Sequence, residues 1–488
     1  MPQARAPRAA FRAAAAAWIS AAASLGALPA VASAEDAAGA PRTVTQTMAS
    51  QRLPPNAVSL VVVDPETGKA VISMNEGTAR SPASTVKVLT TYASLDMLGP
   101  AYTWQTRALV RGEISNGTLN GDLVLQGGGD PFMNLERWWS FARALRNKGL
   151  RTIHGNIVID DGLFTNDATD PGAFDGRPHR NYNVLPDALM VNFQSIEFRL
   201  APNPATRKVD IVTDPLPANL TIDNHVRFAA GRCAGPARRV DFEVASDNDD
   251  HVVFSGALSQ HCAPRSFSRV LMRPADYAFG TFVTLWRELG GEFDGQFKSG
   301  AAPQDARPYV SFDSLSLAEI VRLTNKFSSN LMARHLLLTL GLERFGAPAT
   351  EKKGAQAIAD WSLQRGLSLQ DVDIDNGSGL SRTTHVTVTE MAAVLNSAYH
   401  SRYAPEFLAS LPLAGIDGTL RSRLQDTPAG AVRMKTGHLN GVSGVAGFVT
   451  AKSGKTFIVV SLINHMRTDS GAGEPVHAAL VEWVLDQL

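Results

Sequence analysis

The spacing of apolar residues divides the chain into segments of different secondary structure. Strand-like runs at 58–64 and 69–75 flank the turn sequence Pro65-Glu-Thr-Gly68, which predicts a β-hairpin. Apolar side chains then recur at helical spacing from about residue 84 to residue 98, and this pattern predicts a helix. The first folded part of the chain is thus expected to read strand, strand, helix.

The segment from about residue 104 to residue 308 has a different pattern. Short β-type runs, such as 122–126 and 209–213, alternate with Gly, Asn, Asp and Pro turns. Helical spacing interrupts these runs near 135–148 and 276–289. This middle segment is therefore predicted to be mostly β-structure.

Helical patterns return after residue 312. The sequence Ser316-Leu-Ala-Glu319 has the residue types of a capping box at a helix N-terminus. The end of the chain reads as two strands and a helix, at 444–450, 456–464 and 474–488. Sheet and helix at both ends, with β-rich sequence between them, favour one α/β domain that the two ends build around an insertion.

Residues 1–34 have the layout of a secretory signal peptide. Arginines and no acidic residue precede an apolar stretch rich in alanine, and Ala32-Ser33-Ala34 is typical of a cleavage site. The alternative is an alanine-rich helix of the folded protein, but it does not explain why charge asymmetry and cleavage site coincide. Residues 35–50 are small and polar, which indicates a tether.

Composition excludes several classes of protein. The chain has 488 residues, of which 44% are hydrophobic and 19% charged, as in globular proteins with a sizeable core. Lys+Arg and Asp+Glu both number 46, which argues against a nucleic-acid binder that relies on a basic field. Beyond the N-terminal stretch no apolar run is long enough to predict a transmembrane helix.

The two cysteines, Cys233 and Cys262, are 29 residues apart. In an exported protein we expect such a pair to form a disulfide, and two separately buried thiols are the alternative. His261 adjoins Cys262, but no set of four ligands suggests a metal site. The sequence therefore implies neither a metal nor an organic cofactor.

Three short motifs point to nucleophilic chemistry and occur in order along the chain. Ser84-Thr-Val-Lys87 begins the first predicted helix, Ser328-Ser-Asn330 lies between two helical patterns, and Lys435-Thr-Gly437 lies in a strand-like segment. Each motif alone is a weak signal. Their order and their placement on helix, turn and strand carry most of the information.

The residue types fit an activated serine nucleophile. A serine hydroxyl needs a base within hydrogen-bond reach, and residues i and i+3 share a helix face, so Lys87 can contact Ser84. A lysine is a base only when its pKa falls, which burial beside a second cation such as Lys435 achieves. The helix N-terminus would add N–H groups for a developing oxyanion. Without the other motifs, Ser84 would be interpreted as an N-cap residue and Lys87 as a solvated lysine.

In this order the motifs are the signature set of penicillin-binding proteins and serine β-lactamases. The chain resembles the low-molecular-mass class C penicillin-binding proteins, which are D-alanyl-D-alanine carboxypeptidase/endopeptidases of peptidase family S13. The segments that carry this resemblance are 82–90, 121–131, 182–189, 376–382 and 417–420. The match extends from about residue 50 to residue 488 and includes a large insertion that compact β-lactamases lack.

The resemblance assigns catalytic roles to the motif residues. Ser84 is expected to be the acylated nucleophile, with Lys87 as its general base. Ser328 and Lys435 resemble the pair that relays a proton to the departing D-alanine amine. Asn330 looks like the residue that holds the substrate amide.

The resemblance also assigns residues to substrate binding. Thr436 is similar to the threonine that binds the terminal carboxylate, and Gly437 completes that motif. The backbone N–H groups of Ser84 and His438 would form the oxyanion hole. The positions that match those near a diaminopimelate-type side chain are Asp160, Phe164, Arg382 and Asn440.

Two residues depart from the family's motifs. Ser329 stands where aspartate is usual, but no chemistry is expected of that position. His438 stands where a small hydroxyl residue is usual, and this affects the expected substrate preference and pH dependence rather than the backbone role. A residue on the rim of the cleft is the simpler interpretation of the His438 side chain.

The fold implied by the resemblance is an α/β (α+β) transpeptidase-like domain built from residues 35–100 and 312–488. Its five-stranded antiparallel sheet would be flanked by helices, with the active site at the sheet edge. The insertion, 101–311, is expected to hold two subdomains, one nested in the other, with both cysteines in the nested one.

The function implied is a serine-type D-Ala-D-Ala carboxypeptidase that acts on peptidoglycan stem peptides in the periplasm and is inhibited by β-lactams. D-Ala-to-diaminopimelate crosslinks would be further substrates. A β-lactamase is an alternative, but no Glu-x-x-Leu-Asn sequence stands between Ser328 and Lys435. A catalytically idle peptidoglycan-binding scaffold is the other alternative, although such a protein has no physical need for complete motifs.

Overall fold

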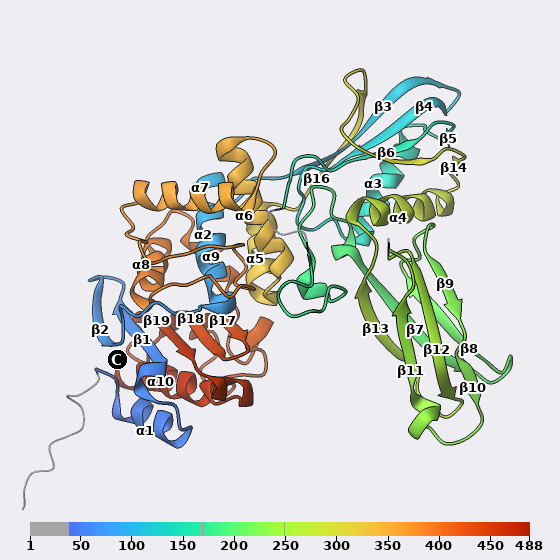
Figure 1. Ribbon diagram of the computed structural model, residues 1–488. Coiled ribbons are helices and arrows are strands. Elements are labelled where there is room, and N and C mark those ends of the chain that lie inside the picture. The colour runs from blue at the N-terminus through green and yellow to red at the C-terminus, as the bar shows by residue number, and fades with distance from the viewer. Residues whose placement is uncertain (1–38, 167–169, 248) are drawn as a thin grey trace, which may run out of the picture.

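The computed structural model describes residues 39–166, 170–247 and 249–488, so the predicted signal peptide lies outside the described residues. A five-stranded sheet in the order β17-β18-β19-β1-β2 joins the two ends of the chain (Figure 1). Its neighbouring strands are all antiparallel. The strands are β1 (Val58–Asp64), β2 (Lys69–Met74), β17 (Val432–Leu439), β18 (Val442–Thr450) and β19 (Thr456–Asn464). The predicted hairpin and C-terminal strands are confirmed.

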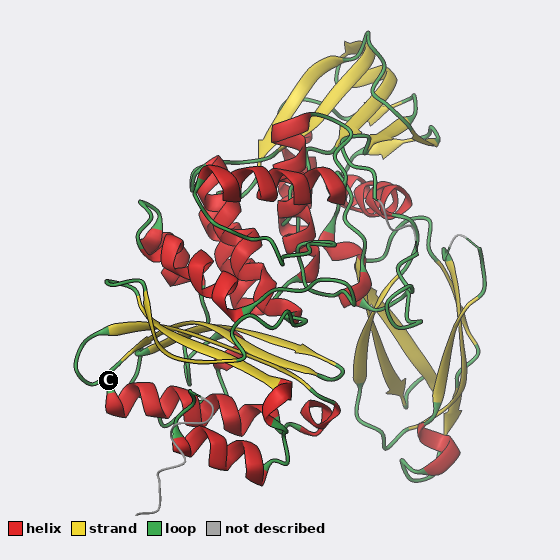
Figure 2. Cartoon of the chain, turned by 60° about the vertical axis from the view of Figure 1, so that its left-hand side comes forward, coloured by secondary structure: helices red, strands yellow, loops and turns green. Residues whose placement is uncertain are grey.

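Helices cover both faces of this sheet (Figure 2). On one face lie α1 (Arg42–Ser50) and α10 (Gly473–Gln487), as Figure 1 shows. On the other lie α2 (Lys87–Leu98), α5 (Leu317–Phe327), α6 (Asn330–Phe345), α7 (Glu351–Gln364), α8 (Val388–Tyr399) and α9 (Ala404–Ser410). Side chains of β1 alternate between the hydrophobic cores on the two faces of the sheet. Leu60 and Val62 pack on the face of α1 and α10, and Val61 and Val63 pack on the other face. The predicted antiparallel sheet between helical layers is confirmed.

The expectation of a tether at residues 35–50 is wrong for its second part. Arg42–Ser50 forms the helix α1, whose Val44 and Met48 lie one turn apart and are buried. Both side chains pack in the same core cluster as Val476 and Leu480 of α10. Two apolar anchors among polar residues are too few for a clear helical pattern in the sequence.

Helix starts agree with the sequence except at the first motif. The capping box of Ser316 and Glu319 is present at the start of α5. Residues Ala83–Val86, however, form a 3-10 turn (η2), and α2 begins only at Lys87. The helix predicted from about residue 84 is thus present, with its first turn in the 3-10 form.

Between α2 and α5 the chain forms separate sheets that stand away from the helical layers (Figure 1). One sheet contains β3 (Gln105–Ser115), β4 (Thr118–Gln126), β5 (Thr152–Ile153), β6 (Ile157–Asp160), β14 (Glu292–Phe293), β15 (Phe297–Ser299) and β16 (Arg307–Asp313). The helices α3 (Leu135–Asn147) and α4 (Pro274–Glu288) pack with it in one core. Both helices were predicted from the sequence.

Two smaller sheets come from the chain between β6 and α4. One contains β9 (Thr221–Asn224), β10 (Arg227–Ala229), β11 (Val240–Val244) and β12 (His251–Ser259), and the other contains β7 (Ser195–Asn203), β8 (Lys208–Asp214) and β13 (Arg265–Val270). The predicted disulfide is confirmed here, since Cys233 after β10 is bonded to Cys262 after β12, with their Cα atoms 5.0 Å apart. In the described ranges, no helix has the length and apolar character needed to cross a membrane.

Candidate active site

The three sequence motifs meet at the β17 edge of the five-stranded sheet. Ser84 lies in η2, which comes directly before α2. Lys435 and Gly437 lie on β17, the last strand of the sheet, whose outer side forms an isolated antiparallel bridge between Arg433 and Leu413. Ser328 ends α5, and Asn330 begins α6. The sheet edge and the ends of three helical segments therefore enclose the candidate site.

The 3-10 geometry of η2 suits the spacing of the first motif. A 3-10 helix has 3.0 residues per turn, so side chains at i and i+3 lie directly above one another. The turn is fixed by Thr85, whose backbone N–H and hydroxyl both donate to the carbonyl of Pro82, at 3.1 and 2.7 Å. Lys87 Nζ consequently donates to Ser84 Oγ at 3.0 Å.

Lys87 is fully buried and has three oxygen partners. Besides Ser84 Oγ, its Nζ donates to Asn330 Oδ1 at 2.8 Å and to the carbonyl of Ser378 at 2.5 Å. Burial lowers the pKa of Lys87 well below its usual value, and the charges of Lys435 and Arg334 lower it further. In the neutral amine, the two N–H groups can donate to Asn330 Oδ1 and to the carbonyl oxygen of Ser378, two atoms that only accept, and the lone pair then faces Ser84. This arrangement allows a proton to pass from Ser84 Oγ to Lys87 Nζ.

The loop at 376–383 contacts Lys87 through the carbonyl of Ser378. Asn376 shapes this loop, because its Oδ1 accepts from the backbone N–H of Ser378 at 3.0 Å and its Nδ2 donates to the carbonyl of Leu380 at 2.9 Å. A Cβ at Gly379 would lie 1.9 Å from the carbonyl oxygen of Ala83, so the loop packs directly against the Ser84 turn. Sequence reasoning assigned no role to Ser378, because a backbone acceptor leaves no mark on the choice of side chain.

Lys435 and Ser328 form the second hydrogen-bonded pair of the site. Lys435 Nζ donates to Ser328 Oγ at 2.8 Å and to the carbonyl of Thr436 at 2.7 Å. Burial lowers the pKa of Lys435 to about 7. Ser328 adopts a left-handed conformation, with φ 56° and ψ 37°, which ends α5 and turns its hydroxyl toward Lys435. Ser329 instead caps α6 by accepting from the backbone N–H of Met332 at 3.3 Å.

Asn330 and Gly437 fix the distances across the site. Asn330 Nδ2 donates to the carbonyl of Tyr182 at 3.1 Å, which orients its Oδ1 toward Lys87. A Cβ at Gly437 would lie 2.6 Å from the carbonyl oxygen of Pro82 and 3.1 Å from the backbone nitrogen of Ser84. Only glycine therefore lets β17 approach the Ser84 turn this closely.

The remaining residues on β17 differ in exposure. Thr436 is buried, with 8% of its surface exposed, and its hydroxyl donates to Thr419 Oγ1 at 2.8 Å. His438 is exposed and follows Gly437 on the same strand. Sequence reasoning placed Thr419 in a segment that resembles the family but gave it no role.

The four residues assigned to a diaminopimelate-type side chain lie in different environments. Asp160 is buried at the end of β6, where its Oδ2 accepts from Gln126 Nε2 at 2.8 Å and from the backbone N–H of Ala302 at 3.0 Å. Phe164 is buried with its ring edge toward His335, at 5.6 Å between ring centroids. Asn440 is exposed in the turn after β17, and exposed Arg382 lies 4.4 Å from the ring centroid of Phe174. Asp160 and Phe164 thus have structural partners, whereas Arg382 and Asn440 are accessible.

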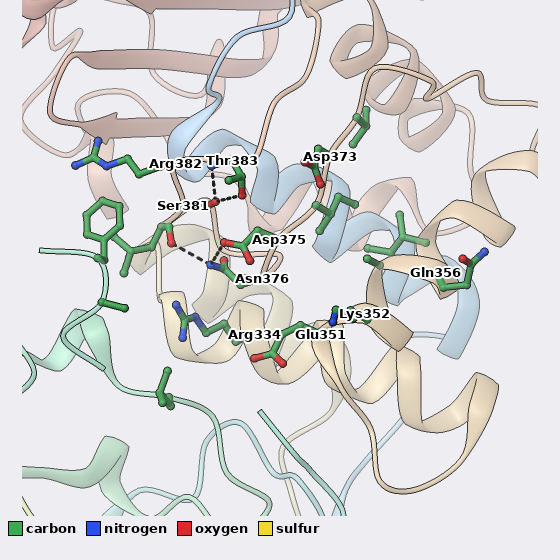
Figure 3. A pocket seen from close by; sticks show the side chains of 18 of the residues that line it. Arg334, Glu351, Lys352, Gln356, Asp373, Asp375, Asn376, Ser381, Arg382 and Thr383 are labelled. Atoms are coloured by element: carbon green, nitrogen blue, oxygen red, sulfur yellow. Dashed lines mark hydrogen bonds between the residues drawn. The ribbon is translucent and has the colours of Figure 1, made fainter. Parts of the chain in front are cut away.

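A cavity of about 770 Å³ is lined in part by residues of the loop at 376–383 (Figure 3). Arg334 of α6 lines it together with Asp375, Asn376 and Arg382 of the loop. Within the described part of the chain, Arg334 Nε is buried without a hydrogen-bond partner, and burial lowers the pKa of this guanidinium. The cavity therefore holds a buried cation whose charge also lowers the pKa of Lys87.

The chain matches known proteins along nearly its whole length. The profile of the D-Ala-D-Ala carboxypeptidase 3 (S13) family matches residues 41–487. The chain is 25% identical over 438 residues to "D-alanyl-D-alanine carboxypeptidase DacB" of Haemophilus influenzae, covering 89% of this chain and 91% of the relative. It is 29% identical over 430 residues to "D-alanyl-D-alanine carboxypeptidase" of an Actinomadura species, covering 83% of this chain and 77% of that relative.

The fold also matches a solved structure. The crystal structure of penicillin binding protein 4 (dacB) from Haemophilus influenzae aligns with a TM-score of 0.73 and 24% identity, covering 90% of this chain and 98% of that one. This likeness confirms the predicted penicillin-binding-protein fold. Since the family profile covers the chain from residue 41 to residue 487, the protein belongs to the D-Ala-D-Ala carboxypeptidase 3 (S13) family.

Proposed function

We propose that this serine-type D-Ala-D-Ala carboxypeptidase cleaves the terminal bond of peptidoglycan stem peptides through an acyl-enzyme on Ser84. The observation that carries this proposal is the position of Lys87. Its Nζ is buried 3.0 Å from Ser84 Oγ, and two further acceptors leave its lone pair for the serine proton. Membership in the carboxypeptidase family supports the same reaction.

Acylation begins with proton transfer from Ser84 Oγ to Lys87 Nζ. The oxygen attacks the carbonyl carbon of the penultimate D-alanine, and the carbonyl oxygen becomes an oxyanion. The backbone N–H groups of Ser84 and His438 are proposed to stabilise that oxyanion, because Gly437 brings β17 next to the Ser84 turn. Donors of this kind contribute about 10²- to 10³-fold each to the rate.

Collapse of the tetrahedral intermediate breaks the C–N bond. Ser328 is proposed to donate its hydroxyl proton to the leaving amine and to regain a proton from Lys435 Nζ, which is 2.8 Å away. A pKa near 7 suits Lys435 to this transfer, since both of its protonation states are then populated at neutral pH. The free D-alanine leaves, and Ser84 carries the shortened peptide as an ester.

Hydrolysis of the ester restores the enzyme. Lys87 first passes the proton from Ser84 through solvent to Lys435, which lost one to Ser328, so both lysines return to their starting states. Lys87 then takes a proton from a water molecule, which attacks the ester carbonyl, and that proton goes to Ser84 Oγ as the C–O bond of the ester breaks. Among the described residues, no carboxylate forms a hydrogen bond with Ser84 or Lys87, so no second base stands beside Lys87. A β-lactam whose opened ring blocks the approach of water is therefore expected to remain attached to Ser84.

The natural substrate and location are further parts of the proposal. A D-Ala-to-diaminopimelate crosslink has the same scissile chemistry, with a larger leaving amine, so endopeptidase activity follows from the same residues. The pattern of residues 1–34 supports export to the periplasm, where such peptides occur. Accessible Arg382 and Asn440 are proposed to contact the third residue of the stem peptide.

The test is release of D-alanine from a stem pentapeptide that ends in D-Ala-D-Ala. The wild type should release one D-alanine per peptide, and Ser84→Ala should release none above background. Ser453→Ala, which changes an exposed serine in a turn, serves as the control and should match the wild type. Full release by Ser84→Ala would refute the proposed nucleophile.

A further inference from the structure

A hydroxyl outside the three motifs lies against the strand that carries Lys435 and Thr436. Thr419 belongs to the short 3-10 turn η6 (Gly418–Leu420), and its Oγ1 lies 2.8 Å from Thr436 Oγ1. Thr419 is partly exposed, whereas Thr436 is buried. Of the two threonines, the one without an assigned role is therefore the more exposed.

An ion pair between buried Lys326 and partly exposed Asp417 holds this turn against the end of α5. Lys326 Nζ donates to both carboxylate oxygens of Asp417, at 2.8 and 2.7 Å, and to the carbonyl of Leu411 at 2.6 Å. The Asp417 carboxylate also accepts from the backbone N–H of Leu413 at 2.9 Å. Lys326 is only two residues before Ser328, so the pair ties the Thr419 turn to the end of α5.

The backbone contact between these segments is equally close. Gly418 has a φ of +56°, and a Cβ there would lie 2.6 Å from the carbonyl oxygen of Lys326. Glycine is therefore needed both for the left-handed conformation and for the approach. The position of Thr419 beside Thr436 is fixed by an ion pair, backbone hydrogen bonds and direct packing.

The pairing of two hydroxyls has a chemical consequence. Each hydroxyl carries one proton and two acceptor positions. When one of the pair donates to the other, one O–H group remains, and it can donate to a third atom outside the pair. A carboxylate, which only accepts, suits such a site, and Lys435 Nζ lies 2.7 Å from the carbonyl oxygen of Thr436.

No side chain on the strand itself supplies this second hydroxyl. Residues i and i+2 of a strand share a face, and the residue that shares the face of Thr436 on the far side of Gly437 is His438. His438 carries an imidazole, so the hydroxyl beside Thr436 comes from the neighbouring turn instead.

We propose that Thr419 is a second carboxylate-binding residue, which together with Thr436 presents a hydroxyl proton to the terminal carboxylate of the peptide. This inference rests on the proposed function, because it takes the carboxylate of the D-Ala-D-Ala end as the ligand. The Lys326–Asp417 ion pair is the positioning element that keeps Thr419 in place.

The experiment compares a stem pentapeptide that has a free C-terminal carboxylate with the same peptide as its C-terminal amide. Thr419→Val removes the hydroxyl and keeps the shape of the side chain. For the free acid, kcat/KM should fall about 10- to 100-fold, the range for a lost hydrogen bond to a charged group. For the amide it should stay unchanged, so the preference for the free acid decreases.

Two further variants separate binding from structure. Thr419→Ser keeps the hydroxyl and should keep the wild-type preference. Thr456→Val is the control, because Thr456 Oγ1 forms a similar hydroxyl pair with Thr450 Oγ1, at 3.0 Å, at the far end of β18 and β19. It should leave kcat/KM unchanged for both peptides. Acylation by benzylpenicillin and by its methyl ester gives the same comparison, because the reactive ring acylates with or without the carboxylate.

Several results would overturn the inference. If Thr419→Val lost activity equally on the free acid and the amide, and on benzylpenicillin and its methyl ester, Thr419 would have a purely structural role. No loss on the free acid would show that Thr419 does not contact the carboxylate. If wild-type enzyme released D-alanine from neither peptide, the proposed function would fail and this inference with it, and that outcome differs from a changed preference in an active enzyme.

Discussion

Gly437→Ala tests how closely β17 must approach the Ser84 turn. A Cβ at this position would lie 2.6 Å from the carbonyl oxygen of Pro82, and an ordinary contact begins at 3.4 Å. The two segments must therefore separate by about 0.8 Å, and neither can yield by a side-chain rotation because the atom in the way belongs to the backbone. This separation opens the space between the N–H groups of Ser84 and His438.

The size of the effect follows from that displacement. A misplacement of about 1 Å in a catalytic arrangement costs roughly 10²-fold in rate, and the loss of one oxyanion donor costs about 10²- to 10³-fold. We expect Gly437→Ala to be acylated by benzylpenicillin about 100-fold more slowly than the wild type. The fold should persist, because β17 pairs with β18 over its whole length.

The assay is stopped-flow or quenched acylation, with circular dichroism and thermal unfolding as checks of the fold. Two other glycines provide a graded comparison. At Gly444 the nearest atom to a Cβ is the end of the Leu462 side chain, 2.9 Å away, which can move, so Gly444→Ala should lose less. At Gly77 a Cβ would meet nothing within 4 Å, so Gly77→Ala should match the wild type.

The result that would refute this reasoning is a well-folded Gly437→Ala protein that is acylated at the wild-type rate. Such a result would mean that the distance between β17 and the Ser84 turn does not control the reaction. A loss in Gly77→Ala as large as in Gly437→Ala would point instead to a general effect of the added methyl group.

Three further predictions concern charge. In Lys435→Gln the rising limb of the pH profile of acylation should move to higher pH, because a neutral Lys87 is the base and the charge of Lys435 no longer lowers its pKa. An unmoved limb would exclude this coupling. Asp417→Asn should lower the free energy of unfolding in urea by about 1–3 kcal/mol, because Lys326 stays buried without its anion, and no change would show that the pair does not clamp the turn. Burial and the charge of Asp161 raise the pKa of Asp187 to about 7. As the pH rises from about 4 to about 7, the free energy of unfolding of the wild type should therefore fall relative to that of Asp187→Asn, by at most about 1.4 kcal/mol per pH unit. Parallel stability curves would contradict this.

The sequence was sufficient for the parts of the site that are encoded by side-chain type. Ser84, Lys87, Ser328 and Lys435 were predicted as one site from their residue types, and the structure brings them together in two hydrogen-bonded pairs. Their catalytic roles stay predictions. The capping box at Ser316 and the β1–β2 hairpin could be predicted because each depends on residues close together in the chain.

The features that sequence reasoning missed depend on contacts between distant segments. The turn at Ser84 is a 3-10 helix, and two distant segments pack closely against it, β17 at Gly437 and the Ser378 loop at Gly379. The carbonyl of Ser378 and the hydroxyl of Thr419 act through position rather than through an unusual residue type. Neither the backbone acceptor nor the hydroxyl pair has a local pattern from which it could be predicted.

Intact-protein mass spectrometry after mixing with benzylpenicillin tests the central claim, acylation of Ser84, most directly. The wild type should gain the mass of one drug molecule, the adduct should persist, and peptide mapping should locate it on Ser84. Ser84→Ala should gain no mass under the same conditions. An adduct of equal extent on Ser84→Ala, or a wild-type adduct located on another residue, would contradict the account.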